Sequence, residues 1–234
     1  MTDLLEIRDI HTFIGQFHIL EGVTVAVPAG SISVLLGRNG AGKTTTLRSI
    51  MGMTPPAQGD IRFLGERING KRPHQIAQMG IGYVPEYRAI FRELTVAEHL
   101  RLAERRSGDL KRKGDLIFEL FPDLQRLYHL RGGQLSGGQQ QMLAIARALV
   151  PDNQLLLIDE PSEGLAPVII QHLMAAIRRL SDQSTVLLVE QNFRMASRLA
   201  DKYVIIDNGR SAVSGAMPDL VEDTATAQRY LGVA

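Results

Sequence analysis

A glycine-rich segment, Gly37-Arg38-Asn39-Gly40-Ala41-Gly42-Lys43-Thr44, constrains the fold more than any other feature of the chain. It follows the apolar run Ile32–Leu36 and precedes Thr45–Ile50, which predict a strand and a helix. Glycines allow backbone N–H groups to close around a phosphate chain, and the helix N-terminus favours the anion. This strand–loop–helix context fits the phosphate-binding pattern G-x-x-x-x-G-K-[ST].

Two side chains at the end of this segment have specific expected roles. Lys43 would reach the β- and γ-phosphates of a nucleotide, and Thr44 would place its hydroxyl on Mg²⁺. The phosphate-binding candidates are Gly37, Asn39, Gly40, Ala41, Gly42, Lys43, Thr44 and Thr45.

The composition of the 234-residue chain excludes several classes of function. There is no cysteine, so disulfides, thiol catalysis and thiolate metal sites are absent. A formal net charge of +1 gives no overall footprint for a polyanion, and no nucleic-acid partner is expected. No apolar run approaches the roughly 20 residues that span a bilayer, and the acidic segment Met1–Glu6 lacks a signal-peptide core. We therefore expect a soluble chain that reaches a membrane only through a partner.

The order of apolar runs predicts an α/β fold with a mostly parallel sheet. Short, partly alternating runs near the N-terminus predict strands at Leu4–Ile10, Gly22–Val27 and Asp60–Gly65. Continuous apolar runs, typical of strands buried on both faces, occur at Leu155–Ile158, Val186–Val189 and Tyr203–Ile206. Helical periodicity is clearest at Gln139–Leu149 and Val168–Leu180. Alternation of such strands and helices is the pattern of a parallel sheet with crossover helices.

Residues 87–131 interrupt this alternation and predict a helical insertion. Thr95-Val96-Ala97-Glu98 is a capping box that opens one helix. Asp115–Leu127 is a second helical run, interrupted by Pro122. Basic residues at Arg105-Arg106 and Lys111-Arg112-Lys113 are interleaved with acids, which favours a solvated face and loop over a lipid or partner contact.

Two further motifs carry chemistry. The buried run Leu155–Ile158 ends in Asp159-Glu160, and open α/β sheets place ligands at such strand ends. Asp159 would hold Mg²⁺, and Glu160 would polarise an attacking water. Leu135-Ser136-Gly137-Gly138-Gln139 begins a helix and forms a second anion-binding nest. Two phosphate-binding elements in one chain indicate that one of them serves a neighbouring subunit.

These motifs resemble those of ATP-binding-cassette (ABC) ATPases along essentially the whole chain. Gly37–Thr44 resembles the Walker A loop, Leu135–Gln139 the LSGGQ signature, and Leu155–Glu160 Walker B. The resemblance implies a single P-loop ABC domain at 1–234, with a mostly parallel core sheet and an antiparallel β subdomain. It places the nucleotide-binding core at 1–86 and 132–234 and the helical subdomain at 87–131.

The same resemblance implies ATP and Mg²⁺ as the bound groups. Two such domains would pair head to tail, each ATP lying between Walker A of one and the signature of the other. The implied catalytic residues are Glu160, Gln191 and Glu86, and the implied Mg²⁺ residues are Thr44, Glu86 and Asp159. The implied contacts with the partner's ATP are Ser136, Gly137, Gly138 and Gln139.

Three positions depart from the family pattern. Glu86 stands where the family usually has Gln, and it keeps an oxygen for Mg²⁺ or water but adds charge. Gln191 stands where the family usually has His, and it can donate to a phosphate but carries no positive charge. Ile14 replaces the aromatic residue that stacks on adenine, which leaves Phe13 or Phe17 as substitutes.

Four segments resemble one subgroup, the second ATP-binding subunit of importers for branched-chain amino acids and related amides or urea. They are Glu86, Glu190-Gln191-Asn192, Gly164-Leu165-Ala166-Pro167 and Tyr230-Leu231-Gly232. The implied partners are a second ABC ATPase subunit in a homo- or heterodimer, two integral-membrane permease subunits and an external solute-binding protein. The implied location is the cytoplasmic face of the cell membrane, as a peripheral subunit.

Two alternatives remain at this point. A soluble ABC-type ATPase acting on DNA or ribosomes is disfavoured because the stretch between Lys43 and Ser136 lacks sustained heptads and the chain has one cassette. A regulatory ATP-binding subunit with weak hydrolysis is disfavoured by Lys43 and Glu160 but agrees with Gln191. The six histidines show no metal-ligand spacing, and no G-x-S-x-G elbow supports serine hydrolysis.

Overall fold

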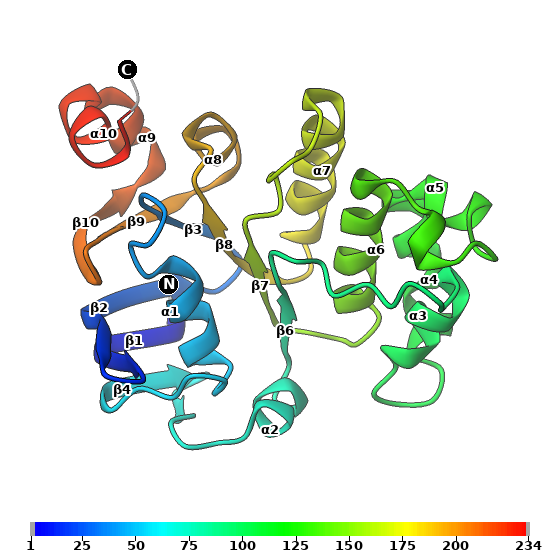
Figure 1. Cartoon of the computed structure of the whole chain (residues 1–234), viewed down its shortest axis with the longest axis horizontal. Coiled ribbons are helices and arrows are strands. Elements are labelled where there is room, and N and C mark those ends of the chain that lie inside the picture. The colour runs from blue at the N-terminus through cyan, green and yellow to red at the C-terminus, as the bar shows by residue number, and fades with distance from the viewer. Residues whose placement is uncertain (1–2, 233–234) are drawn as a thin grey trace.

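Two β-sheets and the helices around them build the computed structural model, which describes residues 3–232 (Figure 1). Met1 and Thr2, which belong to the acidic N-terminal segment, lie outside the described residues, as do Val233 and Ala234. The larger sheet has the order β10 (Arg210–Ala216), β9 (Lys202–Asp207), β3 (Ile32–Leu36), β8 (Thr185–Glu190), β7 (Leu155–Asp159), β6 (Ile81–Val84). Its neighbours pair in parallel except for the antiparallel β9–β10 pair. The mostly parallel sheet predicted from the apolar runs is confirmed.

Burial on both faces explains why the central strands are continuously apolar. Val34 packs with one hydrophobic cluster and its neighbour Leu35 with the other. The first cluster contains apolar side chains of α6 (Gly137–Leu149), α7 (Pro167–Leu180) and α8 (Phe193–Leu199). The second contains side chains of α1 (Lys43–Ile50), α2 (Pro73–Gln78) and the antiparallel sheet. The large sheet is therefore the middle layer between helices and the smaller sheet.

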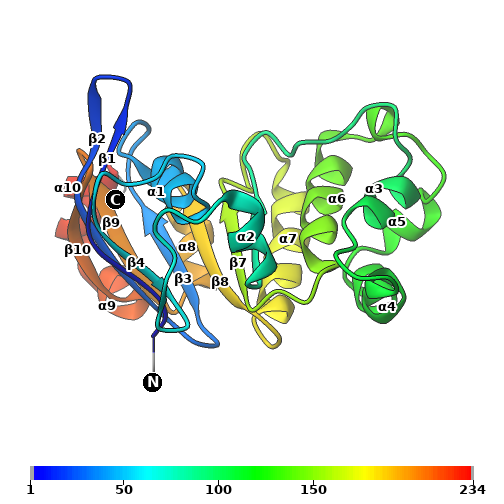
Figure 2. The same ribbon diagram turned by 90° about the horizontal axis from the view of Figure 1, so that it is seen from below.

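The smaller sheet is antiparallel and has the order β2 (Phe17–Pro28), β1 (Asp3–Ile14), β4 (Gln58–Phe63), β5 (Glu66–Arg67). Burial alternates along much of β1 and β2, which agrees with one face on the core and one in solvent. The hairpin that joins β1 to β2 projects beyond the rest of the sheet in Figure 2.

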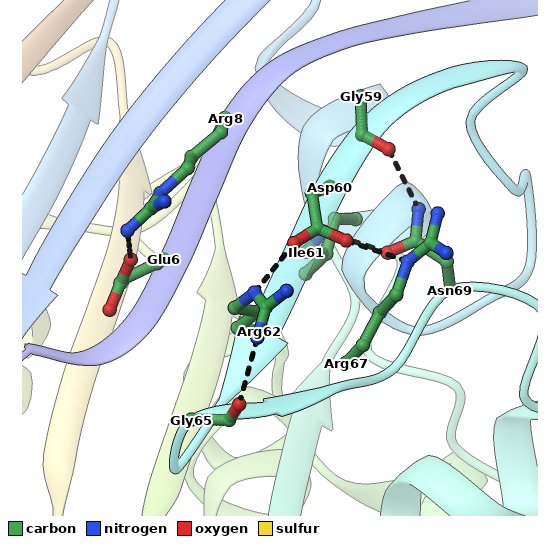
Figure 3. A network of polar contacts seen from close by, with 9 residues as sticks. All are labelled: Glu6, Arg8, Gly59, Asp60, Ile61, Arg62, Gly65, Arg67 and Asn69. Carbon is green, nitrogen blue, oxygen red and sulfur yellow. Dashed lines mark hydrogen bonds and ion pairs between the residues drawn. The ribbon is translucent and has the colours of Figure 1, made fainter.

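Charged side chains line the β4–β5 edge of this sheet (Figure 3). The carboxylate of Asp60 accepts from Nε of Arg62 and pairs with Nε of Arg67, both at 2.6 Å. Oδ1 of Asn69 accepts from the Ile61 N–H at 2.8 Å. Charge along an exposed edge disfavours pairing with a strand of another molecule.

The helical insertion packs beside α6 (Figure 1) and consists of α3 (Val96–Leu102), α4 (Asp109–Leu120) and α5 (Pro122–Arg126). The predicted capping box is confirmed, since Oγ1 of Thr95 accepts from the Glu98 N–H and Glu98 accepts from the Thr95 N–H. The 3₁₀ turn η1 (Gly132–Gln134) leads back to α6. The C-terminal helices α9 (Met217–Glu222) and α10 (Thr224–Leu231) follow β10. No helix of residues 3–232 combines the length and the hydropathy needed to cross a membrane.

The predicted start of the second helix of the insertion is wrong. It was predicted at Asp115, whereas α4 begins at Asp109 and so includes the basic run Lys111-Arg112-Lys113, of which Lys111 and Arg112 are exposed as expected. Arg112 pairs with Asp109, and Nζ of Lys113 lies 2.9 Å from a carboxylate oxygen of Asp152. The helix begins early because the buried Asp109 carboxylate accepts from the backbone N–H groups of Arg105 and Arg106.

Candidate nucleotide-binding site

The candidate residues converge because four neighbouring parallel strands end in register. Leu36 of β3 is paired with Glu190 of β8, and Val189 is paired with Asp159 of β7. Val84 of β6 is paired with Ile158 of β7. The glycine-rich loop, the acidic pair, Gln191 and Glu86 each follow one of these strand ends, where open α/β sheets bind ligands.

Backbone geometry explains the glycines of the loop between β3 and α1. Gly37, Gly40 and Gly42 all have positive φ, at 152°, 79° and 109°. A Cβ on Gly37 would lie 2.3 Å from the carbonyl oxygen of Ile206, and a Cβ on Gly42 would lie 2.6 Å from Cδ2 of Leu20. A Cβ on Gly40 would meet nothing within 4 Å, so this glycine faces open space. The loop is held from behind by the core and is open on the side where a phosphate would sit.

Lys43 is nearly buried beneath this loop, with a side chain 4% exposed. Its ammonium donates to the carbonyl oxygens of Gly37 at 2.9 Å and Arg38 at 3.2 Å. It also forms an ion pair with Oε1 of Glu160 at 3.1 Å. The positive charge is therefore placed between the loop that would hold phosphates and the carboxylate that follows β7.

Thr44 and Asp159 form the expected hydroxyl–carboxylate pair. Oγ1 of Thr44 donates to Oδ1 of Asp159 at 3.0 Å, and the hydroxyl of Tyr83 donates to Oδ2 at 3.3 Å. Burial raises the pKa of Asp159, while the hydrogen bonds from Thr44 and Tyr83 oppose that rise. Burial and the nearby Asp159 charge raise the pKa of Tyr83, so the phenol stays a donor at physiological pH.

This donor set fits a magnesium ion that is shared with phosphates. Mg²⁺ prefers oxygen ligands and is usually held by one or two protein groups together with water and phosphate oxygens. Thr44 and Asp159 supply one hydroxyl and one carboxylate at the mouth of the loop. Among the described residues there is no cluster of three His, Cys, Asp or Glu side chains that could enclose a metal by itself.

Two more carboxylates lie next to this pair. Glu160 has a positive φ of 42°, and its N–H donates to the Val189 carbonyl at 3.0 Å. Glu86 is near enough to Glu163, Asp159 and Glu160 for their charges to act on it. Partial burial first, and then the hydrogen bond and charge of Glu163, raise the pKa of Glu86. The site therefore concentrates negative charge, which a divalent cation would offset.

The signature residues lie on a separate surface at the start of α6. Oγ of Ser136 accepts from the Gln139 N–H at 3.3 Å, and Oε1 of Gln139 accepts from the Ser136 N–H at 2.9 Å. Ser136 and Gly137 are exposed, while Gly138 approaches Ile169 of α7. None of the hydrogen bonds that the structure shows for residues 136–139 reaches the glycine-rich loop.

Comparison with known proteins agrees with this geometry. Residues 20–163 match the ABC transporter family model. The chain belongs to the ABC transporter family. It is similar to the high-affinity branched-chain amino acid transport ATP-binding protein BraG of Pseudomonas aeruginosa, with 40% identity over 98% of this chain and 100% of BraG. It is also similar to the probable branched-chain amino acid transport ATP-binding protein LivF of Archaeoglobus fulgidus, with 34% identity over 93% and 94% of the two chains.

Other ABC relatives act in export. The lipopolysaccharide export system ATP-binding protein LptB of Acidithiobacillus ferridurans is 32% identical over 99% of this chain and 98% of its own. Among solved structures, a nucleotide-free ATP-binding cassette matches with a TM-score of 0.87 at 23% identity over 100% of both chains. The ABC ATPase fold is thereby confirmed. The chain is an ATP-binding subunit of a transporter and an ATPase coupled to transport.

The residues expected to contact adenine lie at the tip of the β1–β2 hairpin. The ring of Phe13 stacks on the ring of His18, with centroids 4.2 Å apart. Ile14 and Phe17 are 45% and 66% exposed. A contact of Phe13 or Phe17 with adenine, in place of the aromatic residue that Ile14 replaces, stays a prediction.

Three side chains near the ABC site were missed in the sequence. Tyr83 donates to Asp159, Glu190 binds the loop after Walker B, and Nε of Arg88 donates to Gln141 of the signature helix at 3.1 Å. Tyr83 and Glu190 stand at the ends of strands, and this position in the sequence could have marked them as site residues. Nothing local marks Arg88, because its partners lie far along the chain.

Proposed function

We propose that this chain is the ATP-hydrolysing subunit of an importer for branched-chain amino acids. The observation that carries the proposal is the 40% identity with BraG, which extends over nearly the whole chain. The complete phosphate loop with Lys43, Thr44 and Asp159 supports hydrolysis rather than binding alone. The relatives that act in export are 32–34% identical, so the choice of solute rests on the stronger similarity.

In this proposal the residues of one chain bind the triphosphate. The loop N–H groups and Lys43 hold its β- and γ-phosphates, and Thr44 and Asp159 hold Mg²⁺, which neutralises charge on those phosphates. Glu86 contributes an oxygen toward the metal or its water. Glu160 accepts a proton from the attacking water, and the amide of Gln191 donates to the γ-phosphate.

A second ABC ATPase subunit completes the site. Ser136, Gly137, Gly138 and Gln139 contact the ATP held by that partner. The pair closes on ATP and reopens after hydrolysis at the cytoplasmic face of the membrane. Two permease subunits and an external solute-binding protein complete the proposed importer.

The test is purification of the tagged chain from native membranes in detergent, with partners identified by mass spectrometry. The proposal expects two polytopic membrane proteins and a second ATPase subunit. The recovered complex, placed in liposomes with its solute-binding protein, should take up labelled leucine, isoleucine or valine when ATP is supplied. Recovery of ribosomes or DNA-bound factors instead would overturn the transport assignment. Uptake of amides or urea but not of these amino acids would overturn the assignment of the solute.

A further inference from the structure

Glu190 is a buried carboxylate at the end of β8 with no part in the scheme above. Its side chain is 1% exposed, yet it accepts three hydrogen bonds. Oε1 accepts from the N–H of Ser162 at 3.1 Å. Oε2 accepts from Oγ of Ser162 at 3.0 Å and from the N–H of Asn192 at 3.1 Å. A buried carboxylate that accepts this many hydrogen bonds holds the donating groups in fixed positions.

These bonds join the two loops that carry the reacting groups. Ser162 follows Glu160 by two residues in the loop after β7, and the Glu160 N–H is itself bonded to the Val189 carbonyl. Asn192 follows Gln191 directly and caps α8 through its side chain, which accepts from the Met195 N–H at 3.1 Å. The Gln191 side chain is exposed, but its backbone lies between Glu190 itself and Asn192, whose N–H is bonded to the Glu190 carboxylate.

The chemistry of the joint requires a carboxylate. Two backbone N–H groups and one hydroxyl point at it, and a carboxylate offers only acceptors. A glutamine of the same shape would turn an NH₂ group toward one of these donors. One N–H would then lose its acceptor, and the peptide that it belongs to would shift.

We propose that Glu190 is a positioning residue that sets Gln191 against the γ-phosphate by fixing the Gln191–Asn192 peptide to the Ser162 loop. This inference rests on the proposed role of Gln191. Its consequence is specific to the third phosphate: loss of the joint weakens binding of a triphosphate and leaves binding of ADP unchanged. A general loss of structure would weaken both.

The experiment is a double-mutant cycle on the purified full chain. The four proteins are wild type, Glu190→Gln, Gln191→Ala and the double variant. Calorimetry with Mg²⁺ gives the affinities for ADP and for the β,γ-imido analogue of ATP, and the ratio of the two affinities is the readout. We expect Gln191→Ala to lower the preference for the triphosphate by roughly tenfold, as for loss of a hydrogen bond to a charged group. Glu190→Gln should lower it by about three- to tenfold, and the double variant no further than Gln191→Ala.

Two controls keep structural loss apart from the positioning effect. Asp109→Asn alters another buried carboxylate that accepts two backbone N–H groups, but in the helical insertion, and should lower Tm without changing the ratio. Ser162→Ala removes the hydroxyl that donates one of the three hydrogen bonds to Glu190, and it should lower the ratio of triphosphate to ADP affinity about twofold. It replaces Glu190→Gln in the cycle if that variant does not fold.

The outcomes separate this inference from the proposed function. If Gln191→Ala changes the ratio and Glu190→Gln does not, the role of Glu190 is wrong and that of Gln191 stands. The role of Glu190 is also wrong if the two effects on the affinity ratio multiply in the double variant, or if Glu190→Gln weakens the binding of ADP as much as that of the triphosphate analogue. An unchanged ratio in Gln191→Ala overturns the role of Gln191 itself, and the inference with it.

Discussion

The two proposed phosphate-binding elements of this chain differ in how much of the chain supports them. The loop Gly37–Thr44 lies against Ile206 and Leu20, and its lysine is paired with Glu160. The signature residues Ser136–Gln139 are held mainly by their own capping box. A Cβ on Gly137 or Gly138 would meet only side chains, namely Nη1 of Arg88 at 3.3 Å or Cγ2 of Ile169 at 3.0 Å. One element is built into the core, and the other is displayed at a helix end.

This difference indicates which properties belong to one chain and which to a pair. The core element holds its lysine, hydroxyl and carboxylate in place without help, so binding of a nucleotide needs one chain. The displayed element has N–H groups and a helix dipole that can act only on a phosphate brought from outside. Hydrolysis should therefore depend on both elements, and affinity at low protein concentration on the first alone.

The largest expected effect comes from Glu160→Gln. The amide keeps a hydrogen-bonding group near Lys43 but cannot accept a proton from water, so kcat should fall by about 10²–10⁴-fold. The affinity for ATP should change by less than about threefold. Steady-state ATPase rates and calorimetric titration check these two values, and hydrolysis at the wild-type rate would show that another group is the base.

A pair of glycine variants sharpens the comparison. Gly138→Ala places a methyl 3.0 Å from Cγ2 of Ile169, a contact that a shift of a few tenths of an ångström relieves, and helical alanine gains about 0.5–1 kcal/mol over glycine. In the proposed pair of subunits, that shift moves the signature N–H groups relative to the partner's nucleotide, and kcat should fall by up to about 10²-fold. Gly37→Ala would instead meet a backbone oxygen at 2.3 Å and should lower Tm. Equal losses of stability in both variants would contradict the division into built-in and displayed elements.

A third comparison concerns nucleotide affinity at low protein concentration. Lys43→Ala removes a buried charge that the proposed function places on the phosphates, and Kd for ATP should rise by about 10- to 100-fold. Ser136→Ala, the matched change in the signature, should leave Kd within about twofold. Fluorescence titration of the dilute chain measures both. A large rise for Ser136→Ala would mean that the signature acts within one chain.

The sequence predicted those parts of the fold that depend on nearby residues, such as apolar runs and glycine-rich turns. The loop Gly37–Thr44 and the fully buried strands β3, β7 and β8 lie where the apolar runs placed them, with small changes at their ends. The edge strand β10 was missed because Arg210–Ala216 is polar and only partly buried. The start of α4 was placed six residues late, because it depends on the Asp109 carboxylate accepting from the backbone N–H groups of Arg105 and Arg106, which helical periodicity does not record.

The site shows the same limit. Residues at strand ends could be grouped from the sequence alone, because parallel strands end together. The contacts of Glu190 with Ser162 and of Arg88 with Gln141 join segments that are distant in the chain. No periodicity records such contacts, so the side chains that hold the loops relative to one another become visible only in three dimensions.

The smallest expected effect is a pH dependence of stability in the helical insertion and in the segment that leads from it to the signature. His99 of α3 is fully buried, and its Nε2 accepts from the Phe91 N–H at 3.0 Å while its Nδ1 donates to the Thr95 carbonyl at 2.8 Å. Burial lowers the pKa of His99, and the charge of Arg147 adds to this effect. A Cβ on Gly132 would lie 3.1 Å from the ring, so His99 supports the segment that leads to the signature.

The sign follows from which state takes up the proton. Below about pH 6.5 the unfolded chain protonates this histidine first, because the folded pKa is lower. The free energy of unfolding should therefore fall as the pH drops from about 6.5, by no more than about 1.4 kcal/mol per pH unit for one proton, and level off below the folded pKa. Urea unfolding at about pH 7.5 and 5.5 measures the loss. His99→Gln should reduce it, and His172→Gln, at an exposed position, should not.

Hydrogen exchange at the same two pH values, corrected for intrinsic rates, locates the loss within the molecule. A proton on Nε2 of His99 would place a second donor opposite the Phe91 N–H and break their hydrogen bond. Residues 90–100 and 130–140 should therefore lose protection against exchange. Residues 37–50, which the core holds through Leu20 and Ile206, should keep theirs. Equal loss in the phosphate loop would mean that acid acts on the whole chain and that the two elements share one support.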